Sequence, residues 1–548
     1  MQRIVWLAIG SLGFLLHASL ASAAARPNIV VVLVDDMGWS DIGCYGSEIP
    51  TPHLDALAAD GLRFTQFYNT GRCSPTRASL LTGLYPHQAG MGHLDNTVRP
   101  GSTGLTGKLA ERAVTMGEVL GAAGYMTAIS GKWHLGQQHG TPPWERGFQR
   151  SLNLPAGGVH FFNQPAGPAK KLYLNGQEHA LDDPEFGEWY GADLWTTYGL
   201  KFIDEAIAAD KPFFLYLAHC APHFPLMAPA ETIAKYRGKY QVGWDVLREQ
   251  RRARQVEMGL IDDSWPLSPR PAACPAWENV NAKNRDRFDH MMAIYAAMID
   301  EVDKNMGRLI DGLRERGQLD NTLVLFLSDN GGNAESGPRG RTEGAPLGGP
   351  TSTVFLGQNW ATLNNTPFRR YKHFVHEGGI STPLIAHWPA GLKAPAGDVE
   401  TFRPASGGML CDAPAHLIDV MATVVDVGEA QYPREFNGHQ ILPAEGVSLR
   451  PALEGRALVR EQPIFFEHEG NRAVRRGQWK LVALNNRPWE LYDMQADRTE
   501  LNNVAEEHPE LVAELIAAWD AWAQRAFVDD WNAKPRSRRQ NRQAAPAT

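Results

Sequence analysis

Two pairs of oxygen-bearing side chains stand out because each pair follows a short apolar run. Asp35-Asp36 follows one such run, and Asp329-Asn330 comes just after another. Hard divalent cations such as Ca²⁺ bind about six to eight oxygen ligands from carboxylates, amides and water. Either pair alone is more typical of a helix cap or a turn. Two such pairs at two run ends favour a cation site over that simpler interpretation.

Cys73 is the cysteine whose surroundings most suggest a reactive group. Pro75 suits a first helical turn and Gly83 suits a helix stop, so Cys73 is predicted at a helix N-terminus. The helix dipole there favours negative charge on the residue or on a bound anion. A lone cysteine is most often a small buried hydrophobe, and a thiolate nucleophile is the next interpretation. Neither explains the acidic pairs.

The elements that must position these residues are predicted from hydrophobic pattern. Continuous apolar runs rich in β-branched and aromatic residues predict buried strands at residues 29–34, 126–129, 213–217, 323–327 and 383–386. Helices are predicted between and after them, at residues 52–60, 115–123, 193–209, 287–316 and 509–525. Such an alternation predicts an α/β fold with a mainly parallel sheet sandwiched by helices.

Each of the first four predicted strands is followed at once by a polar cluster. The two acidic pairs follow the first and fourth strands, residues 131–134 follow the second, and residues 219–223 follow the third. Ligands of open α/β sheets bind outside the carboxyl ends of the strands. We therefore expect the four clusters to converge on one site.

Length and composition bound the protein class. A chain of 548 residues predicts a large catalytic domain plus a smaller one. The net charge is −8 and no long basic run interrupts the body of the chain, so no nucleic-acid partner is expected. Near residue 456 the pattern changes to short strands at residues 464–467, 472–475, 479–483 and 489–492, which predict a small antiparallel sheet with one packed helix.

The N-terminus resembles an export signal. Arg3 precedes a mostly apolar run at residues 4–16, and Ala21-Ser22-Ala23 offers a cleavage site. An uncleaved anchor is the alternative, but the run is short for a membrane span. The prediction is a signal peptide at residues 1–25 and a periplasmic or secreted protein with no membrane association after cleavage. A catalytic domain at 26–455, a C-terminal subdomain at 456–532 and a disordered tail at 533–548 complete the predicted organisation.

Five scattered cysteines do not form a disulfide framework, and their odd number leaves at least one unpaired within the chain. The sequence leaves the pairing of the others open.

Several ordered motifs resemble one enzyme family. The run Cys73-Ser74-Pro75-Thr76-Arg77 matches the Cys-x-Pro-x-Arg signature of type I, formylglycine-dependent sulfatases, and Gly131-Lys132-Trp133-His134 resembles their second signature. Further matches are Asp35-Asp36, Ala221-Pro222-His223, Asp329-Asn330-Gly331, and Lys372 with His376-Glu377-Gly378-Gly379. The matches run in family order from about residue 27 to residue 390. The chain is thus similar to arylsulfatases of the alkaline phosphatase superfamily.

The resemblance implies an alkaline-phosphatase-like fold and a sulfuric ester hydrolase. It implies that a formylglycine-generating maturation enzyme oxidises Cys73, and that the hydrated aldehyde attacks sulfur to give a sulfated enzyme. It also implies one Ca²⁺ ion held by Asp35, Asp36, Asp329 and Asn330, with the modified Cys73 beside it. The substrate would be an aryl or carbohydrate sulfate.

The family roles carry over to the motif residues one at a time. Arg77 would stabilise the diol, and Lys132 and Lys372 would bind sulfate oxygens. His134 would act as base during sulfate release, and His223 would protonate the leaving oxygen. Taken singly, each of these residues would be a surface lysine or a core histidine. His93, Asp95, Asn333 and Glu335 could line the substrate mouth or be ordinary loop residues, and we do not assign them to the site.

Two other functions fit parts of the pattern. Phosphonate monoester and phosphodiester hydrolases of the same superfamily can carry the Cys-x-Pro-x-Arg motif, although the pair Lys132 and His134 favours sulfate monoesters. A non-catalytic sulfated-glycan binding protein would keep the pocket without formylglycine. The sequence does not identify the natural substrate.

Overall fold

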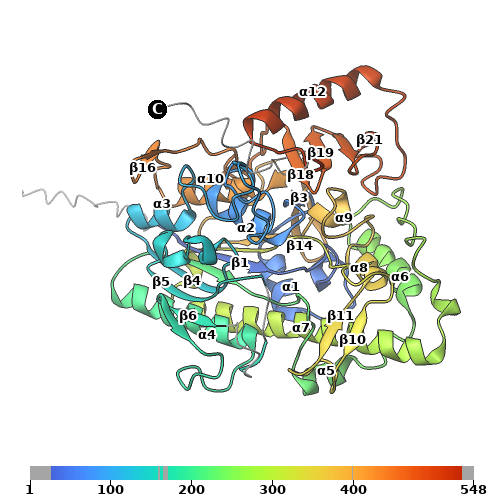
Figure 1. Cartoon of the computed structure of the whole chain (residues 1–548), viewed down its shortest axis with the longest axis horizontal. Coiled ribbons are helices and arrows are strands. Elements are labelled where there is room, and N and C mark those ends of the chain that lie inside the picture. Colours follow the sequence, from blue (N-terminus) through green and yellow to red (C-terminus); the bar gives the residue numbers. More distant parts are fainter. Residues whose placement is uncertain (1–25, 158–160, 164–170, 398, 534–548) are drawn as a thin grey trace, which may run out of the picture.

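The predicted strands form the centre of one eleven-stranded sheet (Figure 1). The computed structural model describes residues 26–157, 161–163, 171–397 and 399–533. The predicted signal peptide lies outside these residues, as does the predicted tail apart from residue 533. Five central strands run parallel, in the order β9 (Thr322–Ser328), β1 (Asn28–Val34), β8 (Phe213–Ala218), β4 (Met126–Lys132) and β5 (Arg150–Leu154).

Antiparallel pairing is found toward both edges of this sheet. Beyond β9 come β12 (Leu384–His387), β2 (Leu62–Phe64), β14 (Gly408–Cys411) and β13 (Phe402–Ala405), with β14 and β2 parallel and the other neighbours antiparallel. Beyond β5 come the antiparallel strands β6 (Leu172–Leu174) and β7 (Gln177–His179). The sheet is mixed with a parallel centre, which confirms the predicted fold class.

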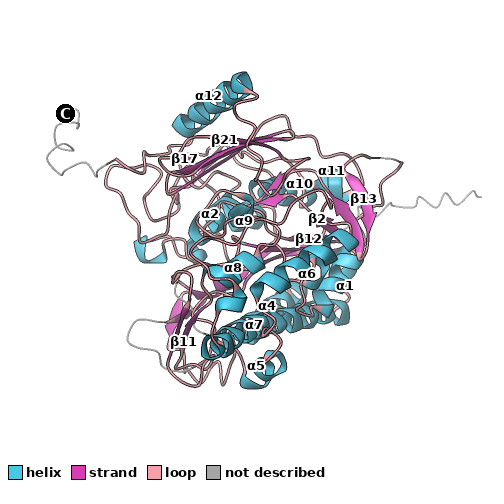
Figure 2. Cartoon of the chain, turned by 90° about the vertical axis from the view of Figure 1, so that its right-hand side faces the viewer, coloured by secondary structure: helices cyan, strands magenta, loops and turns pink. Residues whose placement is uncertain are grey.

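Successive residues of β1 point into two different hydrophobic cores. Val30, Val32 and Val34 pack with one set of helices: α1 (Pro52–Ala59), α4 (Gly191–Ala208), α5 (Ala230–Tyr236), α6 (Trp244–Glu257), α7 (Ala282–Glu315) and α8 (Gln358–Asn364). Ile29, Val31 and Leu33 pack with the other set: α2 (Cys73–Thr82), α3 (Met116–Ala122), α10 (Ile418–Val427) and α11 (Arg450–Leu453). Figure 2 shows α4 and α7 on one side of the sheet and α2 and α10 on the other. Because both faces are covered, every residue of β1 after Asn28 is apolar.

One helix and one strand have bounds that differ from the predicted ones, each for a physical reason. Helix α7 begins at Ala282, not near residue 287, because the side chain of Asn281 accepts a hydrogen bond from the Asn284 backbone and caps the helix. Strand β4 continues through Lys132, beyond the predicted end at residue 129. The register places Gly131 opposite Ala218, where a Cβ would lie 1.9 Å from the Ala218 carbonyl oxygen. Glycine at 131, with φ +123, therefore lets the strand reach the site.

The C-terminal part forms the predicted antiparallel sheet. Its four strands are β18 (Ile464–His468), β19 (Asn471–Arg476), β20 (Trp479–Ala483) and β21 (Glu490–Asp493). Helix α12 (Pro509–Arg525) lies along it, at the top of Figure 1. Phe465 stacks on Trp522 with ring centroids 5.1 Å apart, and Trp519 donates to the Phe466 carbonyl at 3.1 Å. Smaller elements are α9 (Glu377–Ile380) and the two-stranded pairs β10 (Arg341–Glu343) with β11 (Thr353–Phe355), β3 (Phe67–Tyr68) with β15 (Ala415–His416), and β16 (Glu435–Phe436) with β17 (His439–Gln440).

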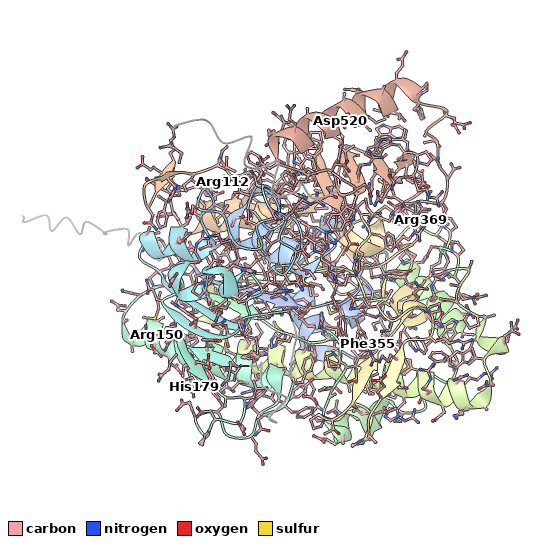
Figure 3. The ribbon with its side chains drawn as sticks, viewed as in Figure 1. Arg112, Arg150, His179, Phe355, Arg369 and Asp520 are labelled. Carbon is pink, nitrogen blue, oxygen red and sulfur yellow. The ribbon has the colours of Figure 1, made fainter. Side chains whose placement is uncertain are left out.

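Buried ion pairs join this sheet to the large domain. The fully buried Glu377 carboxylate, on α9, receives Lys480 Nζ at 2.8 Å and Arg498 at 2.9 Å. Arg369, labelled in Figure 3, reaches the C-terminal sheet through Glu490 Oε2 at 2.5 Å. These contacts hold the two parts closely together. The division into two domains between residues 455 and 456 stays a prediction. No helix in the described part of the chain is long and apolar enough to span a membrane.

Replacing Glu377 by glutamine should destabilise the protein strongly. The change keeps the side-chain shape but leaves Lys480 and Arg498 buried with one carboxylate fewer, which costs about 3–5 kcal/mol in comparable buried pairs. Urea denaturation measures the change in the free energy of unfolding. The control is Glu514→Gln, at the exposed pair with Arg476, where no measurable change is expected. Equal stability of both variants would contradict a stabilising role for the buried network.

Candidate active site

The two acidic pairs lie side by side at the carboxyl ends of neighbouring parallel strands. Val34, the last residue of β1, pairs with Ser328, the last residue of β9. The residues that follow are therefore brought together, and the Asp36 backbone N–H donates to Asp329 Oδ1 at 3.1 Å. Asp36 has a positive φ of 67°, an uncommon conformation for a residue other than glycine. All four side chains of the two pairs are buried.

Cys73 is the first residue of α2, as predicted, and its side chain is 2% exposed. Arg72 is the N-cap residue and makes no side-chain capping hydrogen bond, so the positive end of the helix, at Cys73, is not capped by a side chain. Burial alone raises the pKa of the Cys73 thiol, but the charges of Lys132, His134 and Lys372 outweigh it and bring the pKa well below its ordinary value. Position 73 therefore favours an anionic group.

Arg77 lies one helical turn beyond Cys73 and is completely buried. Its guanidinium group donates to Asp329 Oδ2 at 3.0 Å and lies 3.4 Å from Asp35 Oδ2. It also donates to the carbonyl oxygen of Lys132 at 3.1 Å. Arg77 thus ties the helix to three strand ends, and its permanent charge lies beside position 73.

Two buried lysines face the two aspartates of the first pair. Lys132 Nζ is 2.5 Å from Asp35 Oδ2. Lys372 Nζ is 2.7 Å from Asp36 Oδ1 and 3.8 Å from Glu335 Oε1. Lys132 ends β4, whereas Lys372 comes from the loop between α8 and α9. The lysines enter the site from two separate elements and end on adjacent carboxylates.

The two predicted histidines complete the arrangement. His223 Nδ1 lies against the Phe224 carbonyl oxygen, which requires a proton on Nδ1, and Nε2 lies 3.6 Å from Asp36 Oδ2. Nε2 is therefore the nitrogen that can exchange a proton with the site. His134 has φ 56° and lies 3.5 Å from Asp95 Oδ1. Its carbonyl oxygen accepts a hydrogen bond from the Ser74 hydroxyl at 2.9 Å, next to Cys73.

The pKa values of the three carboxylates of the site are shifted in different directions. Burial raises the pKa of Asp35, but Lys132 and other nearby cations outweigh this effect and keep it well below its ordinary value. Burial also raises the pKa of Asp36, but Lys372 and other nearby cations outweigh this effect and lower the pKa to about 2. Burial and the charge of Asp35 raise the pKa of Asp329 well above its ordinary value. A divalent cation would relieve the repulsion that raises the Asp329 pKa.

The donor set fits a cation. Among the described residues, Asp35 Oδ1 and Asn330 Oδ1 are buried oxygens with no hydrogen-bond partner. Buried polar atoms are almost always paired, so two such oxygens at one site suggest a ligand. One ligand atom each from Asp35, Asp36 and His223 lies within 4.8 Å of the others. Carboxylate and amide oxygens are the ligands that Ca²⁺ prefers.

The structure adds residues that the sequence alone did not assign to the site. Asn333 Nδ2 donates to Asp36 Oδ2 at 2.6 Å, and Tyr216 OH lies 3.4 Å from Arg77. Asp95 contacts His134, as described above. From the sequence alone, Asn333 and Asp95 could either line the substrate mouth or be ordinary loop residues. Only their positions in space distinguish them from other polar loop residues.

All five cysteines are buried and free in the structure. No two of them form a disulfide, which answers the question of pairing that the sequence leaves open.

Comparison with known proteins decides the family. The sulfatase family model matches residues 27–430, which is most of the chain. The chain belongs to the sulfatase family. This sulfatase is 34% identical over 532 residues to an uncharacterised sulfatase of Schizosaccharomyces pombe, covering 90% of this chain and 93% of that one. It is 33% identical over 451 residues to an arylsulfatase of Klebsiella aerogenes, covering 78% and 92% of the two chains.

A solved structure is similar over nearly the same length. The crystal structure of Ps i-CgsB in complex with k-i-k-neocarrahexaose aligns with a TM-score of 0.67 and 25% identity, covering 94% of this chain and 96% of the other. The predicted membership of the sulfatase family and alkaline phosphatase superfamily is confirmed. This sulfatase is therefore a hydrolase of sulfuric esters.

Proposed function

We propose that this sulfatase cleaves sulfate monoesters with a formylglycine made from Cys73 and one Ca²⁺ ion. The observation that carries the proposal is the setting of Cys73: a buried helix N-terminus ringed by Lys132, His134 and Lys372. An anion at this position would meet fixed positive charge in a water-poor pocket, where electrostatic stabilisation of a transition state is largest.

Ca²⁺ would be held by the oxygens of Asp35, Asp36, Asp329 and Asn330, with position 73 beside them. The two unpartnered oxygens, on Asp35 and Asn330, support this assignment. When bound, the ion supplies positive charge that polarises a sulfate oxygen and acidifies a hydroxyl. The lysines that now neutralise Asp35 and Asp36 would then be free to turn toward the substrate.

Formylglycine, when present at position 73, supplies as its hydrated diol one hydroxyl to attack sulfur and a second whose deprotonation expels sulfate. The chain's own residues would do the remaining work. Arg77 holds the position of the diol through its fixed charge, and Lys132 and Lys372 bind sulfate oxygens. His134 accepts the proton during sulfate release.

His223 would donate the proton to the leaving oxygen from Nε2. Its Nδ1 proton is held by the Phe224 carbonyl oxygen, so the ring presents Nε2 to the site in a fixed orientation. Burial lowers the pKa of His223, and the charges of Asp36 and Asp35 work against that effect. Donation requires the protonated ring, which gives up its Nε2 proton in the transition state and regains one afterwards.

Maturation would require a formylglycine-generating enzyme acting before the chain folds. Cys73 is 2% exposed, and all ten residues of α2 are buried. A folded chain would not offer this segment to another enzyme.

The relatives support both aryl and carbohydrate esters as substrates. One is named arylsulfatase, and the human N-acetylgalactosamine-6-sulfatase is 28% identical over 463 residues. The solved Ps i-CgsB structure holds a carbohydrate. We propose an aryl or carbohydrate sulfate and treat the choice between them as an outcome of the test.

The matured enzyme should hydrolyse sulfate monoesters faster than phosphorus esters. The chain is expressed with a maturation enzyme and assayed in Ca²⁺ on 4-nitrophenyl sulfate, 4-nitrophenyl phosphate, a phosphonate monoester and a panel of sulfated sugars. We expect the largest kcat/KM for a sulfate and loss of that activity after chelation, with recovery on adding Ca²⁺. A larger kcat/KM for the phosphonate would favour the phosphonate monoester hydrolase. That alternative shares this fold, since SpPMH of Silicibacter pomeroyi aligns with a TM-score of 0.55 at 21% identity.

A further inference from the structure

A second group of metal-ligating side chains lies next to the candidate active site. His93 Nε2 is 3.0 Å from Glu469 Oε1, and His468 Nε2 is 3.7 Å from the same oxygen. One ligand atom from each of the three residues lies within 4.8 Å of the other two. The rings of His93 and His468 stack with centroids 5.0 Å apart. We refer to His93, His468 and Glu469 as the histidine cluster.

The cluster is built from two distant parts of the chain. His93 comes from the loop after α2, whereas His468 ends β18 and Glu469 begins the turn into β19. Glu469 and Gly470 both have positive φ, 54° and 80°, as in a two-residue type I′ hairpin loop. That loop favours asparagine, aspartate or glycine at its first position. Glutamate is present instead, and its carboxylate points into the cluster.

His468 has the features of a ligand without a partner. Its side chain is completely buried, and neither ring nitrogen makes a hydrogen bond to any described residue. Buried imidazole nitrogens are normally paired, and neutral imidazole is the form that binds metals. This independent observation points to a ligand.

We propose that the histidine cluster is a second metal site, which binds Zn²⁺ through His93 Nε2, His468 Nε2 and Glu469 Oε1. Two imidazoles and one carboxylate are a common protein donor set for Zn²⁺, with a fourth position left open. This set also differs from the all-oxygen site of Asp35, Asp36, Asp329 and Asn330, which suits Ca²⁺. The two sites would therefore select different ions.

His373 holds the second oxygen of the Glu469 carboxylate. Its Nδ1 lies 3.0 Å from Glu469 Oε2, which leaves Oε1 for the ion. His373 also lies 3.3 Å from Glu335, which in turn is 3.8 Å from Lys372. The guanidinium group of Arg72 contacts His373 and lies 3.6 Å from Glu335. The Glu335 carboxylate therefore offsets the positive charge of Arg72.

This chain of contacts indicates what the second ion would do. It would fix the β18–β19 turn against the loop of His93, and through His373 and Glu335 it would hold the loop that carries Lys372. The C-terminal sheet would then be locked beside the substrate pocket. The proposal does not depend on formylglycine chemistry at Cys73.

Metal titration of the matured full-length protein tests the proposal. Metal-free protein is saturated with Ca²⁺ and then titrated with Zn²⁺ by calorimetry, and Co²⁺ is added in parallel for its visible absorption bands. We expect one Zn²⁺ equivalent in the wild type and in Cys73→Ala. The equivalent and the Co²⁺ bands should be lost in His468→Gln and in Glu469→Gln. His373→Ala should bind Zn²⁺ about 10–100-fold more weakly, as for other residues that orient a ligand.

His439→Ala is the matched control, since His439 is an exposed histidine of β17 outside the cluster. It should keep the full Zn²⁺ equivalent. Glu469→Gln changes a partly exposed side chain, so it remains informative if His468→Gln fails to fold. No stoichiometric Zn²⁺ binding in the Ca²⁺-saturated wild type, or equal binding in both cluster variants, would overturn the proposal. Because Cys73→Ala is measured alongside, that result would not bear on the proposed sulfatase chemistry.

Discussion

Changing Cys73 to alanine should reduce sulfate ester hydrolysis by about 10⁴-fold or more, the scale of loss when an enzyme nucleophile is removed. Alanine cannot be oxidised to formylglycine, so neither hydroxyl of the diol would form. The surrounding cations would still bind a sulfate, and substrate binding should therefore fall less than kcat. The assay is initial-rate kinetics on 4-nitrophenyl sulfate with chains expressed alongside a maturation enzyme.

Cys411→Ala is the matched control for this change. Cys411 is also a buried free cysteine, but burial raises its pKa to about 12, whereas the pKa of Cys73 lies well below its ordinary value. A buried, protonated thiol is chemically inert, so Cys411→Ala should keep the activity. Mass spectrometry of the peptide that contains Cys73 gives a second measurement. A persistent thiol there, together with intact sulfate esters, would favour the non-catalytic glycan-binding alternative.

The sequence predicted those parts of the site that follow directly from strand order. Asp35-Asp36 and Asp329-Asn330 could be placed together because apolar runs buried on both faces indicate parallel strands, and parallel strands end at one edge. The register of Val34 with Ser328 then fixes their contact. Pro75 and Gly83 likewise predicted the helix that begins at Cys73. In each case a local pattern determines the position.

Other features of the site depend on contacts between distant segments, which no local pattern encodes. Lys372 and Asn333 come from irregular loops, and their partnership with Asp36 is visible only in the folded chain. Asp36 and His134 have positive φ, which is uncommon for such residues and requires support from the surrounding structure. In the histidine cluster, His93 lies 376 positions before Glu469 in the sequence.

Replacing His223 by asparagine should slow hydrolysis of unactivated sulfate esters by about 10²–10⁴-fold, the usual contribution of general acid catalysis. A sugar alkoxide is a poor leaving group and needs a proton as the S–O bond breaks. A 4-nitrophenolate leaves readily without one, so the same change should affect 4-nitrophenyl sulfate far less. The measured quantity is the ratio of kcat values for a carbohydrate sulfate and 4-nitrophenyl sulfate, in wild type and variant.

His219→Gln separates proton donation from general damage to the site. His219 is also buried and follows the same strand, and burial lowers its pKa to about 4, which leaves it neutral and unsuited to donate a proton. Its replacement should change both substrates by the same factor. Since a general acid must be protonated, wild-type kcat on the carbohydrate sulfate should fall as pH rises through the His223 pKa, and His223→Asn should lose that limb. An equal loss on both substrates in His223→Asn would mean that His223 only positions the substrate or the carboxylate of Asp36.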